Sequence, residues 1–295
     1  MRDLISLDSV SAAEIMAILD LAAQQKRDPE SYLSRPVLRG KAVGLFFEKA
    51  SLRTRLSFEV AVAQLGGTSI YVGQEAGRIG EREAIVDMAK SASRYLDAFV
   101  LRTFKDETIV EMARHATKPV INGLSDKQHP CQILADLQTI RERLGRIEKI
   151  KVAFIGDSNN VCRSLAHALP KFGSQLFVAS PHGYTFAPGF VKSSGITQVA
   201  APVDAVKDAD VVYTDTWTSM GQENEAHKRR AMFQDYQINA ALLSHAPKAI
   251  FMHCLPAHRG DECTDDVIDG PQSVVYDQAE NRLHAQRALL TLLVS

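Results

Sequence analysis

Hydrophobic and polar residues follow two alternating periods along the first part of the chain. The apolar run at 41–47 predicts a buried strand. A capping box, Ser11-Ala12-Ala13-Glu14, precedes apolar residues with helical spacing, so a helix is expected there. Further strands are predicted at 69–72, 98–102 and 119–122, and further helices from Ser51 to a stop at Gly66-Gly67, over 83–89 and over 107–115. Strands that alternate with helices indicate a parallel sheet with crossover helices.

The pattern restarts after a long helix that is predicted from Cys131 to Leu144. Strands are then predicted at 151–157, 175–178, 210–213 and 249–252, with a helix over 161–172. We therefore expect an α/β protein of two domains, each a parallel sheet flanked by helices, over residues 1–130 and 146–277, with 131–145 as a hinge helix. An apolar helix over 283–293 has no strand after it, so the C-terminal segment 278–295 is expected to pack back on the first domain.

The composition narrows the class of protein. The net charge of −1 gives no indication of a nucleic-acid or membrane surface, so any anion site must be a local concentration of cations. The chain lacks the apolar core of a signal peptide and any apolar run long enough to span a bilayer. Its four cysteines show no CxxC pairing. We expect a cytoplasmic protein with free thiols.

The segment Ser51-Leu52-Arg53-Thr54-Arg55 lies where a strand passes into a helix. Cations at a helix N-terminus are unfavourable beside its partial positive charge unless an anion binds there. Free N–H groups, two hydroxyls and a guanidinium would together form a phosphate cradle. The Gly-rich turn of a P-loop is missing. The alternative is a solvated helix start with Ser51 as the N-cap.

Three further polar residues are expected near the carboxyl ends of strands in the first domain. Arg102 ends a predicted strand, and His129 and Gln132 lie one turn apart at the start of the hinge helix. Open α/β sheets bind ligands at this edge. Together these side chains could polarise a carbonyl oxygen. For a lone His, a structural role is the alternative.

Two loops of the second domain also follow predicted strands. Gly156-Asp157-Ser158-Asn159-Asn160 opens a helix but lacks the second and third glycines of a dinucleotide site. Asn159 and Asn160 are better placed to bond a small polar ligand. The loop over 215–223 holds the only Trp, a carboxylate and a hydroxyl, and its alternative is an ordinary loop with an exposed acid.

His253-Cys254-Leu255-Pro256-Ala257-His258 follows another predicted strand. Cys254, between two histidines, could be a nucleophile or a metal ligand. The cysteines lack zinc spacing, however, and no His-Asp partner is evident. We therefore expect no metal and no organic cofactor.

Five ordered motifs resemble those of the aspartate and ornithine carbamoyltransferases. The segment 47–59 is similar to their carbamoyl-phosphate motif, and 129–136 to their second shared motif. Asp215-x-Trp217-x-Ser219-Met220-Gly221, 253–256 and 277–284 resemble the ornithine branch. The resemblance runs from about residue 4 to the end of the chain. It implies the two-domain fold, and a homotrimer or an assembly of trimers with each site at a subunit boundary.

The resemblance also implies roles for individual residues. Ser51, Arg53 and Thr54 would hold the phosphate, and Arg102, His129 and Gln132 the carbamoyl end. Cys254, Leu255 (through its backbone) and Arg282 would close the pocket. Asn160, Asp215, Ser219 and Met220 would hold ornithine, with the carboxylate on its α-ammonium. Two positions depart from the pattern: Leu52 replaces the usual Thr, and Arg78, in a loop that reaches the neighbouring subunit, replaces a common Gln.

The reaction implied is carbamoyl transfer from carbamoyl phosphate to the δ-amine of L-ornithine, giving L-citrulline and phosphate for arginine biosynthesis. Arg102, His129 and Thr54 would stabilise the developing oxyanion, and Cys254 would position the reactants. Three alternatives are a sister enzyme acting on putrescine or N-acetylornithine, a dinucleotide-dependent oxidoreductase, and a catalytically dead binding paralogue.

Overall fold

The computed structural model describes residues 1–218 and 223–294, and it divides into two compact units. Unit 1 comprises Met1–Gln138 and Glu280–Ser295, and unit 2 comprises Thr139–Ala279. Two helices, α6 (Pro130–Leu144) and α13 (Val275–Val294), continue along the chain from one unit into the other. Unit 1 is therefore discontinuous in sequence.

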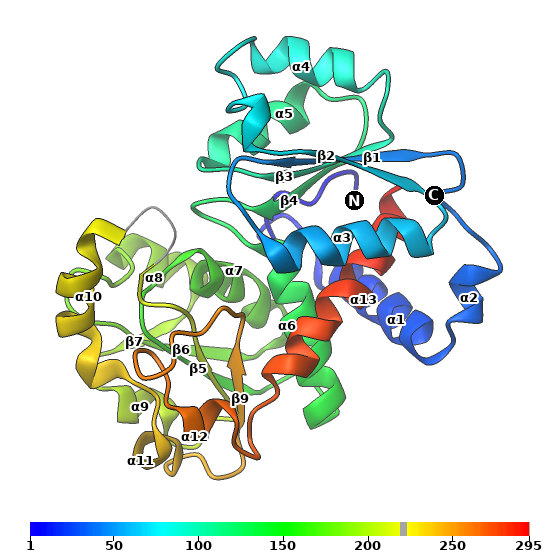
Figure 1. Ribbon diagram of the computed structural model, residues 1–295. Helices are drawn as coiled ribbons and strands as arrows, with labels where there is room; N and C mark the ends of the chain where they lie inside the picture. Colours follow the sequence, from blue (N-terminus) through cyan, green and yellow to red (C-terminus); the bar gives the residue numbers. More distant parts are fainter. Residues whose placement is uncertain (219–222, 295) are drawn as a thin grey trace. The chain divides into compact units, whose positions relative to one another are not determined.

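Unit 1 is built on a four-stranded parallel sheet of order β2-β1-β3-β4 (Figure 1). Its strands are β1 (Ala42–Phe47), β2 (Thr68–Val72), β3 (Ala98–Arg102) and β4 (Val120–Leu124). Its helices are α1 (Ala12–Arg27), α2 (Glu30–Leu33), α3 (Leu52–Gln64), α4 (Ile85–Ala92) and α5 (Asp106–His115), with a 3₁₀ turn η1 (Gln74–Ala76). Helices α4 and α5 cover one face of the sheet, and α1, α3 and the end of α13 lie on the other. The central strands are buried on both faces, which explains their continuous apolar runs.

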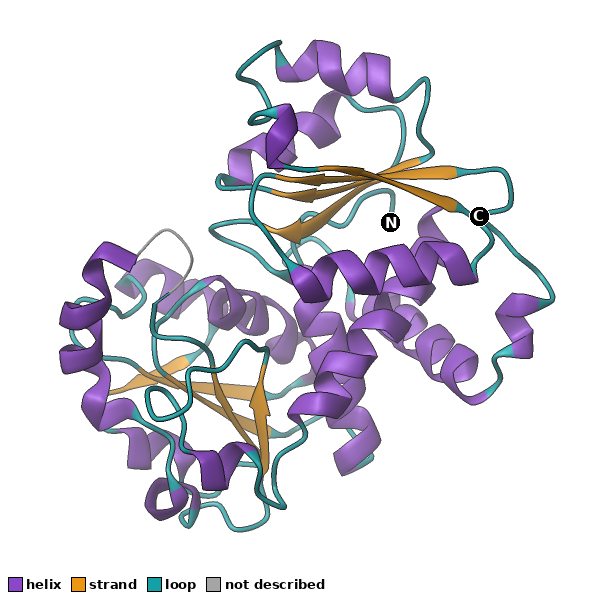
Figure 2. Ribbon diagram, viewed as in Figure 1, coloured by secondary structure: helices purple, strands orange, loops and turns teal. Residues whose placement is uncertain are grey.

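Unit 2 repeats this layered plan around a five-stranded parallel sheet of order β7-β6-β5-β8-β9. Its strands are β5 (Lys151–Ile155), β6 (Gln175–Ala179), β7 (Thr197–Val199), β8 (Val211–Thr214) and β9 (Ile250–His253). Its helices are α7 (Asn160–Ala168), α8 (Pro188–Ser194), α9 (Pro202–Val206), α10 (Ala226–Phe233), α11 (Ala240–Leu243) and α12 (Asp265–Ile268), with 3₁₀ turns η2 (Leu169–Phe172), η3 (Glu223–Glu225) and η4 (Gln234–Tyr236). Helices α9, α11 and α12 pack on one face and α7 on the other, so strands lie between helical layers (Figure 2).

The predicted fold class, two parallel sheets flanked by helices, is confirmed. Gly66 follows α3 with a φ of +80°, the left-handed conformation expected of a helix stop. The helix predicted over 161–172 instead ends as α7 and continues as the 3₁₀ turn η2, because Pro170 has no N–H to donate. The last helix begins at Val275 rather than at 283. Among the described residues, no helix combines the length and apolarity needed to span a bilayer.

Each sheet has a point at which the strand order reverses, and these points position the site. In unit 1 it lies between β1 and β3, which pair in parallel with Phe47 opposite Arg102. In unit 2 it lies between β5 and β8. Successive crossovers leave such a point in opposite directions, so a crevice opens at the carboxyl ends of its two strands, where ligands bind. The candidate residues after β1, β3, β5 and β8 all follow these ends.

Candidate active site

The cradle segment begins at Ser51, which is the N-cap of α3. Its Oγ accepts a hydrogen bond from the backbone N–H of Thr54 over 3.3 Å. The capping interpretation is therefore correct for local structure, and it is compatible with anion binding. The first N–H groups of a helix have no intrahelical acceptor, and here the helix follows the carboxyl end of β1.

The two arginines of this segment have different surroundings. Arg55 donates to Glu59 over 2.9 Å, and its guanidinium lies 3.7 Å from the centre of the Tyr71 ring. The half-buried Arg53 side chain makes no hydrogen bond or ion pair with any residue that the structure describes. Arg55 is thus neutralised locally, whereas the charge of Arg53 is available to an anion.

A buried hydrogen-bonded group lies beside the cradle within unit 1. Arg282 donates from α13 to Gln132 Oε1 over 2.6 Å and to Thr54 Oγ1 over 3.2 Å. Gln132 in turn donates to Asp136 over 2.8 Å. Thr54, Gln132 and Arg282 are only 2%, 1% and 3% exposed. The planar guanidinium therefore fixes the side chains of three helices around one point.

Arg102 and His129 complete the part of the site that lies in unit 1. Both side chains are 5% exposed, at the end of β3 and just before α6. Burial, reinforced by the charges of Arg282 and Arg102, holds the pKa of His129 well below its usual range. His129 is consequently a neutral imidazole at pH 7, able to donate one hydrogen bond to a carbonyl oxygen.

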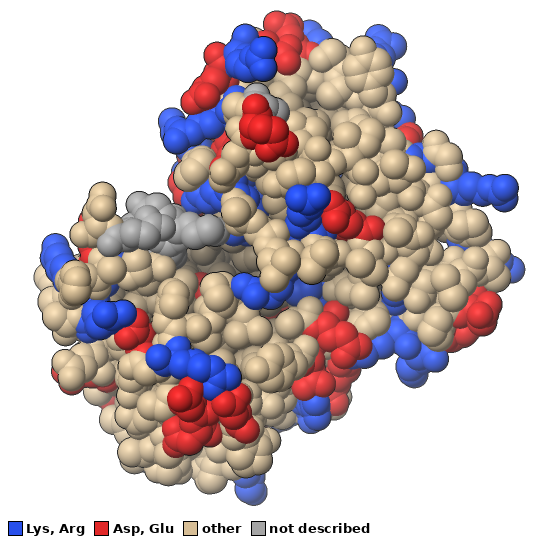
Figure 3. Space-filling model, in the orientation of Figure 1, with Lys and Arg blue, Asp and Glu red and all other residues tan. Residues whose placement is uncertain are grey.

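The cationic character of this site is local. On the face drawn in Figure 3, Lys and Arg side chains are interspersed with Asp and Glu, and uncharged residues cover most of the surface. Arg53, Arg102 and Arg282 all belong to unit 1. This arrangement matches the expectation of an anion site in a chain without net positive charge.

Arg78 lies apart from these residues, on the surface of unit 1. Its side chain is 62% exposed, with Nε 3.8 Å from Glu81 Oε1. The guanidinium carbon lies 4.7 Å from the centre of the Phe104 ring. The structure therefore gives Arg78 no role inside the cradle of its own chain.

In unit 2, Asp215 follows β8 and is held by three donors. Its Oδ2 accepts from Asn159 Nδ2 over 2.7 Å, and its Oδ1 accepts from the Thr216 N–H over 2.8 Å and from Cys254 Sγ over 3.0 Å. The carboxylate is thus fixed in orientation at the switch point of the second sheet. Asn160 is the first residue of α7, directly after Asn159, the N-cap.

The segment after β9 is ordered by His253. Its Nδ1 accepts from the Leu255 N–H over 2.9 Å, and its Nε2 lies 3.1 Å from Glu262 Oε1. Because Nδ1 accepts, the ring proton resides on Nε2 and is donated to Glu262. Leu255 has a φ of +56°, which costs energy for a branched residue and is stabilised by this bond. The imidazole therefore sets the backbone around Cys254 and Leu255.

A potential metal-binding cluster, Asp215, His253 and Cys254, has its ligand atoms within 4.8 Å of one another. Both ring nitrogens of His253 are already in hydrogen bonds. The imidazole could coordinate an ion only by breaking one of them. The cluster is better described as a hydrogen-bonded group that fixes Asp215 and Cys254.

Ser219 and Met220 lie outside the described residues. The segment before them is anchored by Arg229, which donates to the Trp217 carbonyl oxygen over 2.8 Å and to Asp157 over 2.7 Å. Sequence reasoning did not identify Arg229, Asp136 or Glu262 as partners of the site. The sequence offered one signal, which was the charge of these three side chains. The structure shows that all three are buried, and a buried ionisable group requires a partner.

Comparison with known proteins identifies the family to which this protein belongs. Residues 2–142 match the carbamoyl-phosphate-binding domain of aspartate/ornithine carbamoyltransferases, and residues 148–293 match their Asp/Orn-binding domain. The chain belongs to the aspartate/ornithine carbamoyltransferase family. The family resemblance of its five motifs is thereby confirmed.

The similar proteins belong to the ornithine branch. The chain is 48% identical to the ornithine carbamoyltransferase of Symbiobacterium thermophilum, over 100% of this chain and 98% of that protein. It is 47% identical to that of Bacillus subtilis, over 99% and 94%. The solved ornithine carbamoyltransferase of Pyrococcus furiosus superposes with a TM-score of 0.94 at 48% identity, covering 99% of this chain and 97% of that one.

Proposed function

We propose that this protein transfers the carbamoyl group of carbamoyl phosphate to the δ-amine of L-ornithine, giving L-citrulline and phosphate. The observation that carries the proposal is the cationic group at the switch point of unit 1, in the part of the chain that matches a carbamoyl-phosphate-binding domain. The names of full-length relatives support ornithine as the acceptor.

The phosphate is held by Ser51, Arg53 and Thr54 in this proposal. Arg53 supplies an unengaged charge, and the start of α3 supplies N–H donors. The carbamoyl oxygen is bound by Arg102 and His129, with Gln132 and Arg282 beside them. As the amine attacks, the carbonyl oxygen gains negative charge, which fixed donors stabilise without reorganising.

Ornithine is held by unit 2. The Asp215 carboxylate, already fixed by Asn159 and Cys254, pairs with the α-ammonium. Asn160, Ser219 and Met220 bind the carboxylate end or close the loop, and Leu255, through its backbone, helps to close the pocket around carbamoyl phosphate. Cys254 acts by position rather than as a nucleophile, and the reaction uses no metal or organic cofactor.

We further propose a cytoplasmic homotrimer, or an assembly of trimers, in which Arg78 completes the site of a neighbouring subunit. The exposed face of α3 supports an assembly: Leu52, Leu56 and Val60 recur every fourth residue and are 69%, 50% and 41% exposed.

Residues 131–145 act as a hinge between domains 1–130 and 146–277, with 278–295 belonging to the first domain. A relative named as anabolic, from Pyrococcus furiosus, supports a role in arginine biosynthesis.

A carbamoyl-transfer assay that measures the carbamoylated product of each of four acceptors tests the function. Ornithine should react, and aspartate, putrescine and N-acetylornithine should not. Putrescine has no α-ammonium for Asp215, and the acetyl group of N-acetylornithine removes that charge. Product from putrescine or N-acetylornithine alone would identify a sister enzyme, and no product from any acceptor would identify a binding paralogue.

A further inference from the structure

Glu48 is a buried acid that the proposed reaction does not use. It directly follows β1, and its side chain is 8% exposed. Its Oε1 accepts from the Ile79 N–H over 2.9 Å, and its Oε2 accepts from the Phe104 N–H over 2.8 Å. One carboxylate thus joins the segment after β1, the loop that carries Arg78, and the segment that follows Arg102.

The backbone of Glu48 strengthens this junction. Its N–H donates to the Arg102 carbonyl oxygen over 2.9 Å, and its carbonyl oxygen accepts from Gln74 Nε2 over 3.1 Å. Both Gln74 and Ile79 lie in the loop over 73–82. Glu48 therefore holds this loop at two points, one on each side of Gly77.

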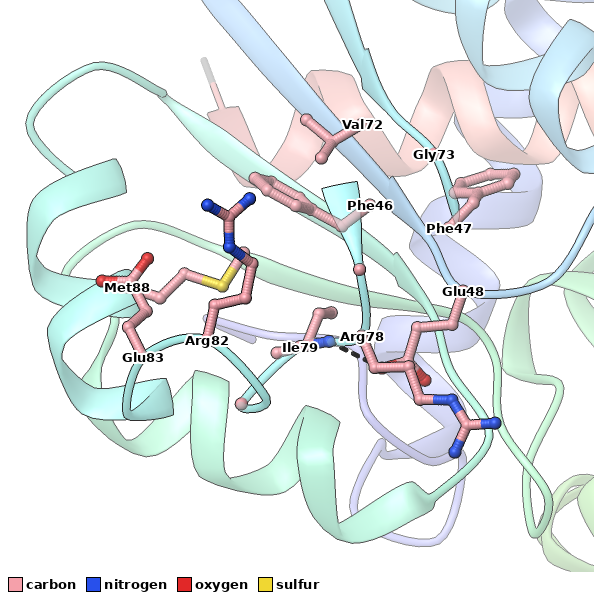
Figure 4. Close-up of a pocket in the computed structure, with 12 residues that line it drawn as sticks. Phe46, Phe47, Glu48, Val72, Gly73, Arg78, Ile79, Arg82, Glu83 and Met88 are labelled. Carbon is pink, nitrogen blue, oxygen red and sulfur yellow. Dashed lines mark hydrogen bonds between the residues drawn. The ribbon is translucent and has the colours of Figure 1, made fainter. Parts of the chain in front are cut away.

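The loop contains little regular structure. Gly77 and Gly80 have φ values of +84° and +88°, and the only regular structure is the short turn η1. A cavity of about 410 Å³ lies beneath it, lined by Phe46, Glu48 and Met88 among others (Figure 4). Ile79 packs against the hydrophobic cluster around Phe46, but several other residues of the loop border the cavity, so the position of the loop also depends on hydrogen-bonded anchors.

Glu48 also fixes Phe104, which lies beside the Arg78 guanidinium. Glu48 accepts a hydrogen bond from the backbone N–H of Phe104, and the centre of the Phe104 ring lies 4.7 Å from the guanidinium carbon of Arg78. Ile79, the other N–H partner, is the residue after Arg78. Figure 4 shows the guanidinium directed away from Phe46 and Met88, on the far side of the Glu48–Ile79 bond.

We propose that Glu48 is a positioning residue for carbamoyl phosphate binding, acting through Arg78 by holding the loop over 73–82 against the ends of β1 and β3. The inference rests on the proposed function and extends it, because the binding of carbamoyl phosphate would depend on the buried carboxylate of Glu48. A carboxylate is suited to this role because two backbone N–H groups require two acceptor oxygens. An amide offers only one.

The test is a double-mutant cycle of steady-state kinetics with Glu48→Gln, Arg78→Ala and the double variant. Glu48→Gln should raise KM for carbamoyl phosphate about tenfold, the factor expected from losing one charge-assisted hydrogen bond, with KM for ornithine unchanged within about twofold. In the Arg78→Ala background the same change should add less than about twofold, because the residue it acts through is absent.

Two control variants distinguish a positioning role of Glu48 from a general effect of removing a negative charge and from a loss of folding. Glu83→Gln removes a carboxylate near the same loop that makes no hydrogen bond among the described residues, and should leave both KM values unchanged. Glu48→Asp keeps the charge with a shorter reach, and replaces Glu48→Gln if the latter does not fold. Hydrogen exchange at the Ile79 and Phe104 amides should be faster in the Glu48 variants than in the unmodified protein.

Three outcomes overturn the inference while the unmodified protein still forms citrulline. The first is an unchanged KM for carbamoyl phosphate in both Glu48 variants. The second is a tenfold rise of that KM when Glu48→Gln is added to Arg78→Ala. The third is an unchanged rate of hydrogen exchange at the Ile79 and Phe104 amides in the Glu48 variants. If the unmodified protein forms no citrulline, the proposed function fails instead, and only the exchange result then bears on the role of Glu48 as an anchor.

Discussion

Arg282 donates a hydrogen bond to Thr54 Oγ1 over 3.2 Å, although the two residues are separated by 228 positions in the chain. The same guanidinium bonds Gln132, and the Gln286 amide, oriented so that its oxygen faces Arg282, accepts at 3.0 and 3.2 Å. One donor on the last helix therefore orients side chains on α3 and α6.

Replacing Arg282 by Lys should lower kcat by about 10²–10³, since a point charge cannot orient Thr54 and Gln132 together. Steady-state kinetics with both substrates would measure this. Arg287→Lys is the matched control on α13, because Arg287 is equally buried but bonds Gln25 and Gln64. It should lower the melting temperature and leave kcat unchanged. Equal kinetic effects of the two changes would contradict the assignment of Arg282.

The adjacent arginines of the cradle give a second matched pair. Arg53→Ala should raise KM for carbamoyl phosphate about 10- to 100-fold, since a charged hydrogen bond contributes roughly 1.5–3 kcal/mol. The fold should survive, because the guanidinium has no hydrogen-bonding partner within residues 1–218 and 223–294. Arg55→Ala should change KM less than about threefold, since that side chain bonds Glu59 at the surface. Near-unmodified kinetics for Arg53→Ala would show that the cradle is assigned wrongly.

Asp215 should affect ornithine rather than carbamoyl phosphate, and Cys254 should affect the rate. Asp215→Asn should raise KM for ornithine about tenfold or more, because it removes the charge that pairs with the α-ammonium. Cys254→Ser keeps a donor to Asp215 and should reduce kcat without a covalent intermediate. Mass spectrometry of rapidly quenched samples checks this. A carbamoylated Cys254 in those samples would make it a nucleophile.

The depressed pKa of His129 predicts a loss of stability in acid. Folded His129 resists protonation, whereas the unfolded imidazole gains a proton as pH falls below about 6.5. Stability is therefore complete above that pH and decreases below it, by at most about 1.4 kcal/mol per pH unit for one group. His129→Gln should reduce the difference between urea denaturation at pH 7.5 and 5.5. His284, whose pKa burial also lowers, should still contribute in that variant. An unchanged difference would rule out this role of His129.

The shared-site proposal predicts complementation between inactive variants. Assayed alone at a carbamoyl phosphate concentration below the KM of the unmodified protein, Arg53→Ala and Arg78→Ala should each have little activity. When the two proteins are dissociated, mixed and reassociated, the cradle of an Arg78→Ala chain can meet the loop of an Arg53→Ala chain, and activity should partly return. Mixed trimers verified by native mass spectrometry that remain inactive would exclude the shared site. A fully active Arg78→Ala enzyme would exclude it as well.

The sequence predicted most strands of both sheets because they are short, largely buried apolar runs. It also predicted β2, whose positions are exposed or half-buried, from the β-branched and aromatic residues Ile70, Tyr71 and Val72. It did not predict β7, whose positions are exposed or half-buried and so give no apolar run. The first turns of α13 were missed for a related reason. Val275 and the residues after it mix charged and apolar side chains, and their burial depends on tertiary contacts.

For the site, sequence reasoning identified residues at strand ends but not the bonds between them. Thr54, Gln132 and Arg282 were assigned from separate motifs, and nothing in their spacing indicates that they share one guanidinium. Glu48 lies three residues before Ser51, yet its two N–H partners come from later loops. Such long-range bonds follow from topology, which local patterns do not encode.

The discontinuity of unit 1 has a consequence for biosynthesis. A ribosome that has completed residues 1–138 has made β1 to β4, Thr54 and Gln132, but not Arg282. All of residues 139–279 must be translated before that guanidinium exists. A nascent chain, or a fragment that ends at residue 138, therefore presents Thr54 and Gln132 without the donor that they share. The cradle of Ser51, Arg53 and Thr54 is therefore synthesised before the donor that orients Thr54 and Gln132.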